Sequence, residues 1–85
     1  MINANLDHIS IVVRNIEDSL SKVQSVLGLS GSVNHNANPQ YSKSALIETE
    51  TSNIELIQPT DQDTEIYSFL SSRGEGLHHL TFSTN

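Results

Sequence analysis

A chain of 85 residues makes one domain at most, and its ten acidic and four basic side chains give it a net charge of −6. The basic residues are scattered, which argues against nucleic acid as a partner, and the lack of cysteine excludes a disulfide framework or a thiolate site. No apolar run approaches the roughly 20 residues of a membrane span and no signal peptide is readable, so we expect a cytoplasmic protein with no membrane partner.

An alternating strand and an amphipathic helix open the chain. Leu6–Val13 alternates with the period of a strand, with isoleucines on one face and His8 on the other. Asn15 then offers an N-cap, and apolar residues recur at helical spacing over Ile16–Leu27. Gly28 is a suitable residue to end this helix.

The rest of the chain predicts four more strands and a second helix. A polar turn joins the third and fourth strands as a hairpin, and Pro59 ends the fourth because it cannot donate to a ladder. Thr60 or Asp61 is expected to cap the second helix, which Gly74 ends. The expected strands are Ser32–His35, which is weak, Tyr41–Glu48, Ser52–Gln58 and Leu77–Phe82.

This order predicts an α+β fold with a curved, mostly antiparallel sheet. Residues 1–85 would form a single βαβββ module, followed by a connecting helix and one further strand. Leu6–Ile11 and Leu77–Phe82 form a faint repeat: each opens with a leucine, has a histidine two residues later and continues as an alternating strand.

Three ionisable residues lie inside these apolar strands. Alternation puts His8, Glu55 and His79 on the concave face of the sheet, if helices cover the apolar faces. Burying such groups costs free energy unless they are paired or bind something. Two imidazoles and one carboxylate suit Zn, Fe(II), Co, Ni or Mn, with positions left for a substrate's oxygens.

The alternative is that these are structural residues, because a single strand histidine is more often structural than a ligand. The same alternation turns His78 to the opposite face, which favours a structural or supporting role. His35 lies in a polar loop and is expected to be solvated. Asp61, Asp63 and Glu65 are most simply a capped, solvated helix start.

Two segments resemble the vicinal oxygen chelate superfamily, which includes glyoxalase I, extradiol dioxygenases, fosfomycin and bleomycin resistance proteins and methylmalonyl-CoA epimerase. The opening Leu-Asp-His-Ile-Ser-Ile-Val-Val is common to many members. The segment Ile-Glu-Leu-Ile-Gln-Pro-Thr, followed by Arg-Gly-Glu-Gly-Leu-His-His-Leu, is more specific and looks most like methylmalonyl-CoA epimerase. Residues 77–83 resemble the first strand of a second module.

The resemblance implies the same three metal ligands. His8 matches the metal histidine of the family's first strand, Glu55 the Gln or Glu ligand of the fourth, and His79 the histidine that opens the second module. It also implies a divalent metal ion (Zn, Co, Ni, Mn or Fe) and a lyase or isomerase that stabilises an enediolate formed by proton abstraction.

The chain also departs from the family. The family's fourth ligand is a glutamate late in the second module, a part that this sequence does not reach. In addition, Ser42–Ala45 lacks the carboxylate that epimerases can carry in the corresponding strand. The catalytic base is therefore unidentified. Two alternatives remain open: a non-catalytic, resistance-type module that binds a small molecule, and a truncated structural dimer.

A homodimer is expected, because one module leaves a half-open groove and an exposed sheet edge. In one geometry the final strand begins the missing second module and completes the site with His79. In the other, the partner's first strand takes that place, so that His8 and Glu55 of both chains converge. The close match of the segment around His79 to the family favours the first.

Overall fold

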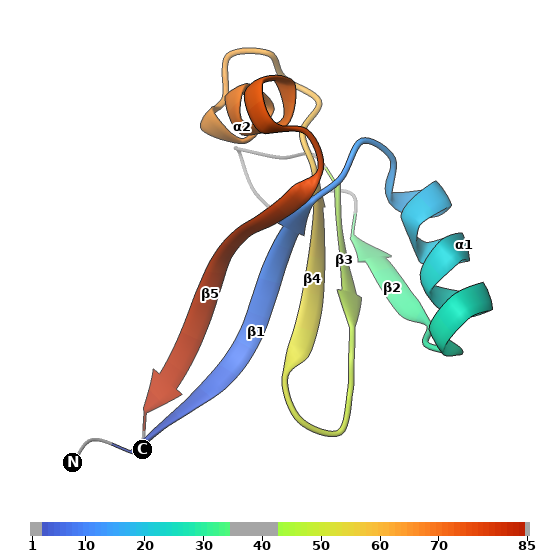
Figure 1. Cartoon of the computed structure of the whole chain (residues 1–85), viewed down its shortest axis with the longest axis vertical. Helices are drawn as coiled ribbons and strands as arrows, with labels where there is room; N and C mark the ends of the chain where they lie inside the picture. Colours follow the sequence, from blue (N-terminus) through green and yellow to red (C-terminus); the bar gives the residue numbers. More distant parts are fainter. Residues whose placement is uncertain (1–2, 35–42, 85) are drawn as a thin grey trace.

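The computed structural model describes residues 3–34 and 43–84, which form two helices and one five-stranded sheet in an α+β fold. The curved sheet has the strand order β2-β3-β4-β1-β5, with the first and last strands of the chain side by side (Figure 1). The elements are β1 (Ala4–Val12), α1 (Ile16–Leu27), β2 (Gly31–Asn34), β3 (Lys43–Ile47), β4 (Asn53–Gln58), α2 (Glu65–Arg73) and β5 (Gly76–Thr84).

The sheet is mixed but mostly antiparallel, as expected. The β2–β3, β3–β4 and β1–β5 ladders are antiparallel, and the β1–β4 ladder is parallel. The element order therefore matches the predicted βαβββ unit with an added helix and strand. No helix in residues 3–34 or 43–84 is long and apolar enough to cross a membrane.

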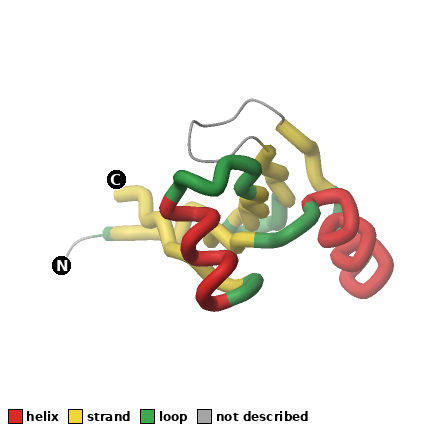
Figure 2. The backbone as a smooth tube through the Cα atoms, turned by 90° about the horizontal axis from the view of Figure 1, so that it is seen from above, coloured by secondary structure: helices red, strands yellow, loops and turns green. Residues whose placement is uncertain are grey.

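The two helices pack against opposite faces of the sheet. On α1, Ile16 belongs to a core cluster with Val13 and Leu56, whereas Ile66 of α2 belongs to a second cluster with Val12 and Ile57. Consecutive strand residues point to opposite faces, so the two clusters lie on different sides of the sheet. From above, the helices lie well apart (Figure 2).

Helix α1 begins and ends where its capping residues predict. The Asn15 side chain accepts a 2.9 Å hydrogen bond from the backbone N–H of Asp18. Gly28 adopts the left-handed conformation (φ 71°), and its N–H donates to the carbonyl of Gln24 at 2.9 Å.

The predicted start of α2 is wrong. Its N-cap is Thr64, whose side chain accepts from the N–H of Tyr67, and not Thr60 or Asp61. Asp61 instead makes a turn before the helix: its side chain accepts from the N–H of Asp63, and its carbonyl accepts from the Thr64 hydroxyl. Asp and Thr suit both roles, so composition alone did not locate the first turn.

Strand β2 is short, and its pairing with β3 brings two backbones close together. Gly31 lies opposite Ile47, and a Cβ at Gly31 would lie 2.8 Å from the carbonyl oxygen of Leu46. The polar loop with His35, and the start of the expected strand at Tyr41, lie outside the described residues.

Two β-bulges interrupt the ladder between β1 and β5. The extra residue on β1 is Asp7 and the extra residue on β5 is His78, and neither has a residue opposite it. The pairs that flank the first bulge are Leu6 with Phe82 and His8 with Thr81, and those that flank the second are Ser10 with His79 and Ile11 with Leu77.

The bulges are related by an approximate two-fold axis through the pair formed by Ile9 and Leu80. In the faint repeat, His8 corresponds to His79 and Ser10 corresponds to Thr81. The pairing is symmetric under this correspondence: His8 lies opposite Thr81, and His79 lies opposite Ser10. The repeat seen in the sequence is therefore two neighbouring antiparallel strands in space.

The bulge on β5 turns Leu77 to the face opposite the one that simple alternation gives. Simple alternation puts Leu77 on the same face as His79. In the structure Leu77 lies opposite Ile11, whose side chain packs toward α1, so Leu77 is on the other face.

Candidate metal centre

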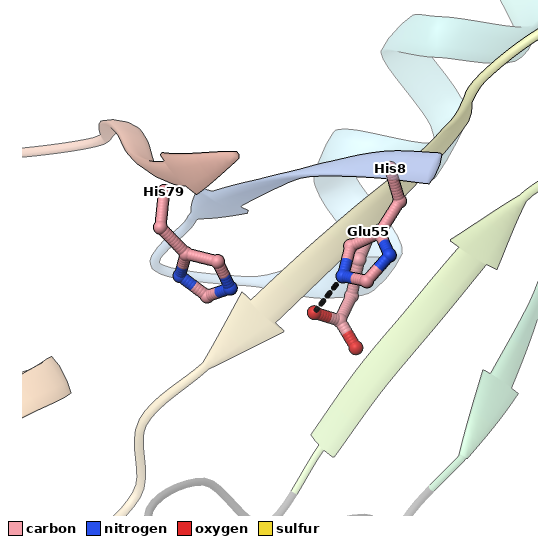
Figure 3. A group of neighbouring side chains, drawn as sticks. All are labelled: His8, Glu55 and His79. Carbon is pink, nitrogen blue, oxygen red and sulfur yellow. Dashed lines mark ion pairs between the residues drawn. The ribbon is translucent and has the colours of Figure 1, made fainter. Parts of the chain in front are cut away.

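The three predicted site residues come together on one face of the sheet, on the three strands at its β5 side. His8 on β1, Glu55 on β4 and His79 on β5 each offer one ligand atom, and these atoms lie within 4.8 Å of one another (Figure 3). Strands β4, β1 and β5 are adjacent, and Ser10 lies opposite both Glu55 and His79. The predicted common face therefore exists.

Each of the three donors also contacts a second polar side chain, and for Glu55 it is Ser10. The Ser10 hydroxyl donates a 2.9 Å hydrogen bond to Oε1 of Glu55, and Ser10 is completely buried. This bond holds one carboxylate oxygen beside β1. Strand alternation puts Ser10 on the same face as His8, but nothing in the sequence signals its hydrogen bond to Glu55.

His8 lies between two carboxylates. Its Nδ1 is 2.7 Å from Oδ2 of Asp7, and its Nε2 is 4.0 Å from Oε1 of Glu55. The first distance is that of a hydrogen bond, and the second is too long for one. The short contact fixes the ring so that its other nitrogen faces the carboxylate of Glu55 (Figure 3).

His79 contacts the neighbouring His78, which the alternation pattern had placed on the opposite face. That expectation is wrong, because the bulge brings the two rings together: their Nδ1 atoms are 2.8 Å apart. The ring of His78 also packs edge-on against Phe69 of α2, with centroids 5.0 Å apart. The His8 and His79 rings lie 6.3 Å apart across the site.

The donor set fits a divalent transition ion in chemistry, and its donor atoms lie somewhat farther apart than a bound ion requires. Two imidazoles and a carboxylate are the ligands preferred by Zn and its neighbours. Ligand bonds of about 2.1 Å require donor atoms roughly 3.0–3.5 Å apart. The 4.0 Å between His8 Nε2 and Glu55 Oε1 therefore needs only a small side-chain rotation.

Comparison with known proteins identifies the family. The sequence model of the Glyoxalase/Bleomycin resistance protein/Dioxygenase superfamily matches residues 7–85, which include both bulges and all three donors. The chain belongs to this superfamily. The resemblance expected from the His8 and His79 segments is thus confirmed at the family level.

Two similar proteins come from Bacillus species. The uncharacterized protein YqjC of Bacillus subtilis is 36% identical over 80 residues, which cover 94% of this chain and 57% of that protein. The crystal structure of hypothetical protein BH1468 from Bacillus halodurans is 35% identical with a TM-score of 0.84, covering 94% of this chain and 58% of that one. This superfamily member therefore spans a little over half the length of the relatives that it matches.

An epimerase also shares this arrangement of strands and helices. Methylmalonyl-CoA epimerase from Mycobacterium tuberculosis is 27% identical with a TM-score of 0.73, over 89% of this chain and 52% of the epimerase. The half-length likeness to methylmalonyl-CoA epimerases that the sequence predicts is therefore present in the fold.

Proposed function

We propose that this chain provides a divalent-metal centre formed by His8, Glu55 and His79, and that it acts as a lyase or isomerase of the glyoxalase or methylmalonyl-CoA epimerase kind. The observation that carries this proposal is the meeting of three donor atoms within 4.8 Å on a superfamily fold. A bound divalent ion supplies Lewis-acid stabilisation of negative charge on two neighbouring substrate oxygens.

The chain's own residues would position the reacting group. His8 and His79 approach the centre from two adjacent strands, and Ser10 holds the Glu55 carboxylate beside them. Proton abstraction needs a base that is not itself a ligand. Glu55 is assigned as a ligand and Asp7 is hydrogen-bonded to His8, so neither is free to act as the base, which would have to come from a partner chain.

Metal uptake by tag-free protein tests the centre. Elemental analysis and titration of metal-free protein with Co(II) should give one ion per centre with a ligand-field absorption band. His8→Ala or His79→Ala should abolish that binding, whereas His35→Ala should leave it unchanged. Equal retention of the ion by all three variants would refute the assignment.

Proton exchange tests the reaction. Metal-loaded protein incubated with a methylmalonyl thioester in heavy water should incorporate deuterium at the carbon next to the thioester, and the His79→Ala variant should not. A second candidate function is a non-catalytic small-molecule-binding module, which the lack of an assigned base favours. Metal uptake without exchange on this thioester or on a glyoxalase-type hemithioacetal would support that alternative.

The proposed assembly is a homodimer in which β5 stays on its own chain. Strand β5 forms one edge of the sheet and exposes Leu77, Leu80 and Phe82. Pairing of β5 with β1 of the same chain supports the geometry in which His79 completes the centre. The other geometry would require β5 to be displaced before a partner's first strand could replace it.

A further inference from the structure

We propose that Asp7 and His78 are positioning residues: each hydrogen-bonds Nδ1 of the histidine that follows it, so that the unprotonated Nε2 of His8 and of His79 faces the centre. Glu65 of α2 assists by lying next to the other ring nitrogen of His78. The purpose of this arrangement rests on the proposed metal centre. Its hydrogen-bond pattern belongs to the chain itself and can be observed in metal-free protein.

For His8 the argument follows from donors and acceptors. An ionised carboxylate only accepts hydrogen bonds, so the 2.7 Å contact with Asp7 places the imidazole hydrogen on Nδ1. In the neutral ring Nε2 then carries a lone pair. This nitrogen faces Oε1 of Glu55 at 4.0 Å. Both atoms are hydrogen-bond acceptors, and no hydrogen lies between them. A cation between the two atoms satisfies both.

For His79 the partner that fixes the tautomer is a second imidazole, that of His78. The two Nδ1 atoms of His78 and His79 are 2.8 Å apart, so one of them must donate and the other accept. The Nε2 of His78 lies 4.0 Å from Oε1 of Glu65, which is an acceptor. This carboxylate favours the hydrogen on Nε2 of His78, and the Nδ1 of His78 then accepts from His79. His79 is left with a bare Nε2.

The contribution of Glu65 is weaker than that of Asp7. Its side chain is 78% exposed and its oxygen is beyond hydrogen-bond distance, so solvent screens it. The His78 ring itself is held more firmly, because it is mostly buried and packs edge-on against Phe69. We therefore expect His78 to dominate the orientation of His79, with Glu65 adjusting it.

The two bulges are what make this arrangement possible. In a regular strand, the residue before each histidine would point to the other face of the sheet. Here both preceding residues are the extra residues of bulges, and both side chains turn back onto the histidine ring. The same device occurs at equivalent places of the two related strands, which is the pattern expected of histidines that need a fixed ring and tautomer.

Tautomers in metal-free protein provide the first test. Long-range proton–nitrogen correlation spectra of isotope-labelled protein at mildly alkaline pH should show hydrogen on Nδ1 of both His8 and His79, and on Nε2 of His78. In His78→Phe the Nδ1–H form of His79 should lose its dominance, whereas His8 should be unchanged. Hydrogen on Nε2 of His79 in the unmodified protein would overturn the inference.

Metal affinity provides the second test. Loss of a residue that orients a ligand typically lowers affinity about 10- to 100-fold without changing the number of ions bound. We expect such a loss of Co(II) affinity in Asp7→Ala and in His78→Phe, with partial recovery in Asp7→Asn and His78→Gln, which restore an acceptor. Glu65→Gln should have a smaller effect, and Glu50→Gln, the same change on the β3–β4 turn, should have none.

The two tests separate this inference from the proposed function. The expected tautomers in a protein that takes up no ion would support the positioning roles and contradict the metal centre. Stoichiometric uptake that is equally tight in His78→Phe and Asp7→Ala would support the centre and contradict the positioning roles.

Discussion

Ser10 and Glu55 lie opposite each other in the parallel β1–β4 ladder, and the Ser10 hydroxyl donates a 2.9 Å hydrogen bond to Oε1 of Glu55. Ser10 is also opposite His79 on its other side. One small, fully buried hydroxyl therefore lies at the middle of the three strands that carry the candidate ligands.

Replacing this serine should loosen the centre. Ser10→Ala removes the hydrogen bond to a half-buried carboxylate, so we expect the free energy of unfolding to fall by about 1–2 kcal/mol. Co(II) affinity should fall about tenfold because Glu55 loses its orientation. Urea unfolding and metal titration measure the two effects. Ser44→Ala, a second buried serine on β3, is the control, and an equal loss of metal affinity there would contradict the assigned role.

Of the two glycines in the described strands, Gly31 and Gly76, Gly31 should tolerate replacement by alanine less well. A Cβ there would meet the Leu46 carbonyl oxygen at 2.8 Å and side-chain carbons of Leu20 and Ile47 at 3.0 Å. Because a backbone atom cannot easily move away, Gly31→Ala should lower the free energy of unfolding by about 1–3 kcal/mol. Gly76→Ala on β5, with no atom within 4 Å of the added carbon, should be tolerated. Similar urea midpoints for both variants would contradict the crowding at β2.

A bound ion should stabilise the fold. An ion that binds only the folded chain, at a concentration one hundred times its dissociation constant, adds about 2.7 kcal/mol. Thermal melting should therefore shift upward with Zn or Co, and the shift should be lost in His8→Ala and His79→Ala but kept in His35→Ala. A chelator should reverse it.

The exposed edge should form the subunit contact. Sedimentation at micromolar concentration should show a dimer, and deletion of residues 76–85 should weaken it. Leu80 and Phe82 are apolar residues of β5 that are 48% and 60% exposed. Replacing either by a charged residue, in Leu80→Glu or Phe82→Glu, should shift the equilibrium toward monomer. Val26→Glu, at an exposed position on α1, is the control. A well-folded monomer in unmodified protein would contradict the proposed homodimer.

Local patterns predicted the elements whose signals are local. Asn15 and Gly28 bracket a regular apolar stripe, so the bounds of α1 followed from the sequence. Alternation also placed His8, Glu55 and His79 on one face, because that face is set by strand period and survives small errors in strand ends. The start of α2 did not follow, because several Thr and Asp residues compete as caps and tertiary contacts decide among them.

The contacts around the site were predicted least well. A bulge arises from how two strands pair, and nothing in the period of a single strand reveals it. Consequently strand alternation alone predicts the wrong face for His78 and gives no role to Asp7. The clue available in the sequence was the repeat itself: a polar residue precedes the histidine at the same place in both strands.

The separation of the ligands along the chain has a further consequence. His8 and His79 come from opposite ends of the described chain, yet they lie on adjacent strands. An ion held by both would close a loop that contains most of the molecule, in a protein with no cysteine for a covalent cross-link. In the chain-entropy description, a disulfide closing a loop of this length contributes about 4 kcal/mol. The ion would act as a reversible cross-link, so that formation of the β1–β5 ladder would depend on the concentration of available metal.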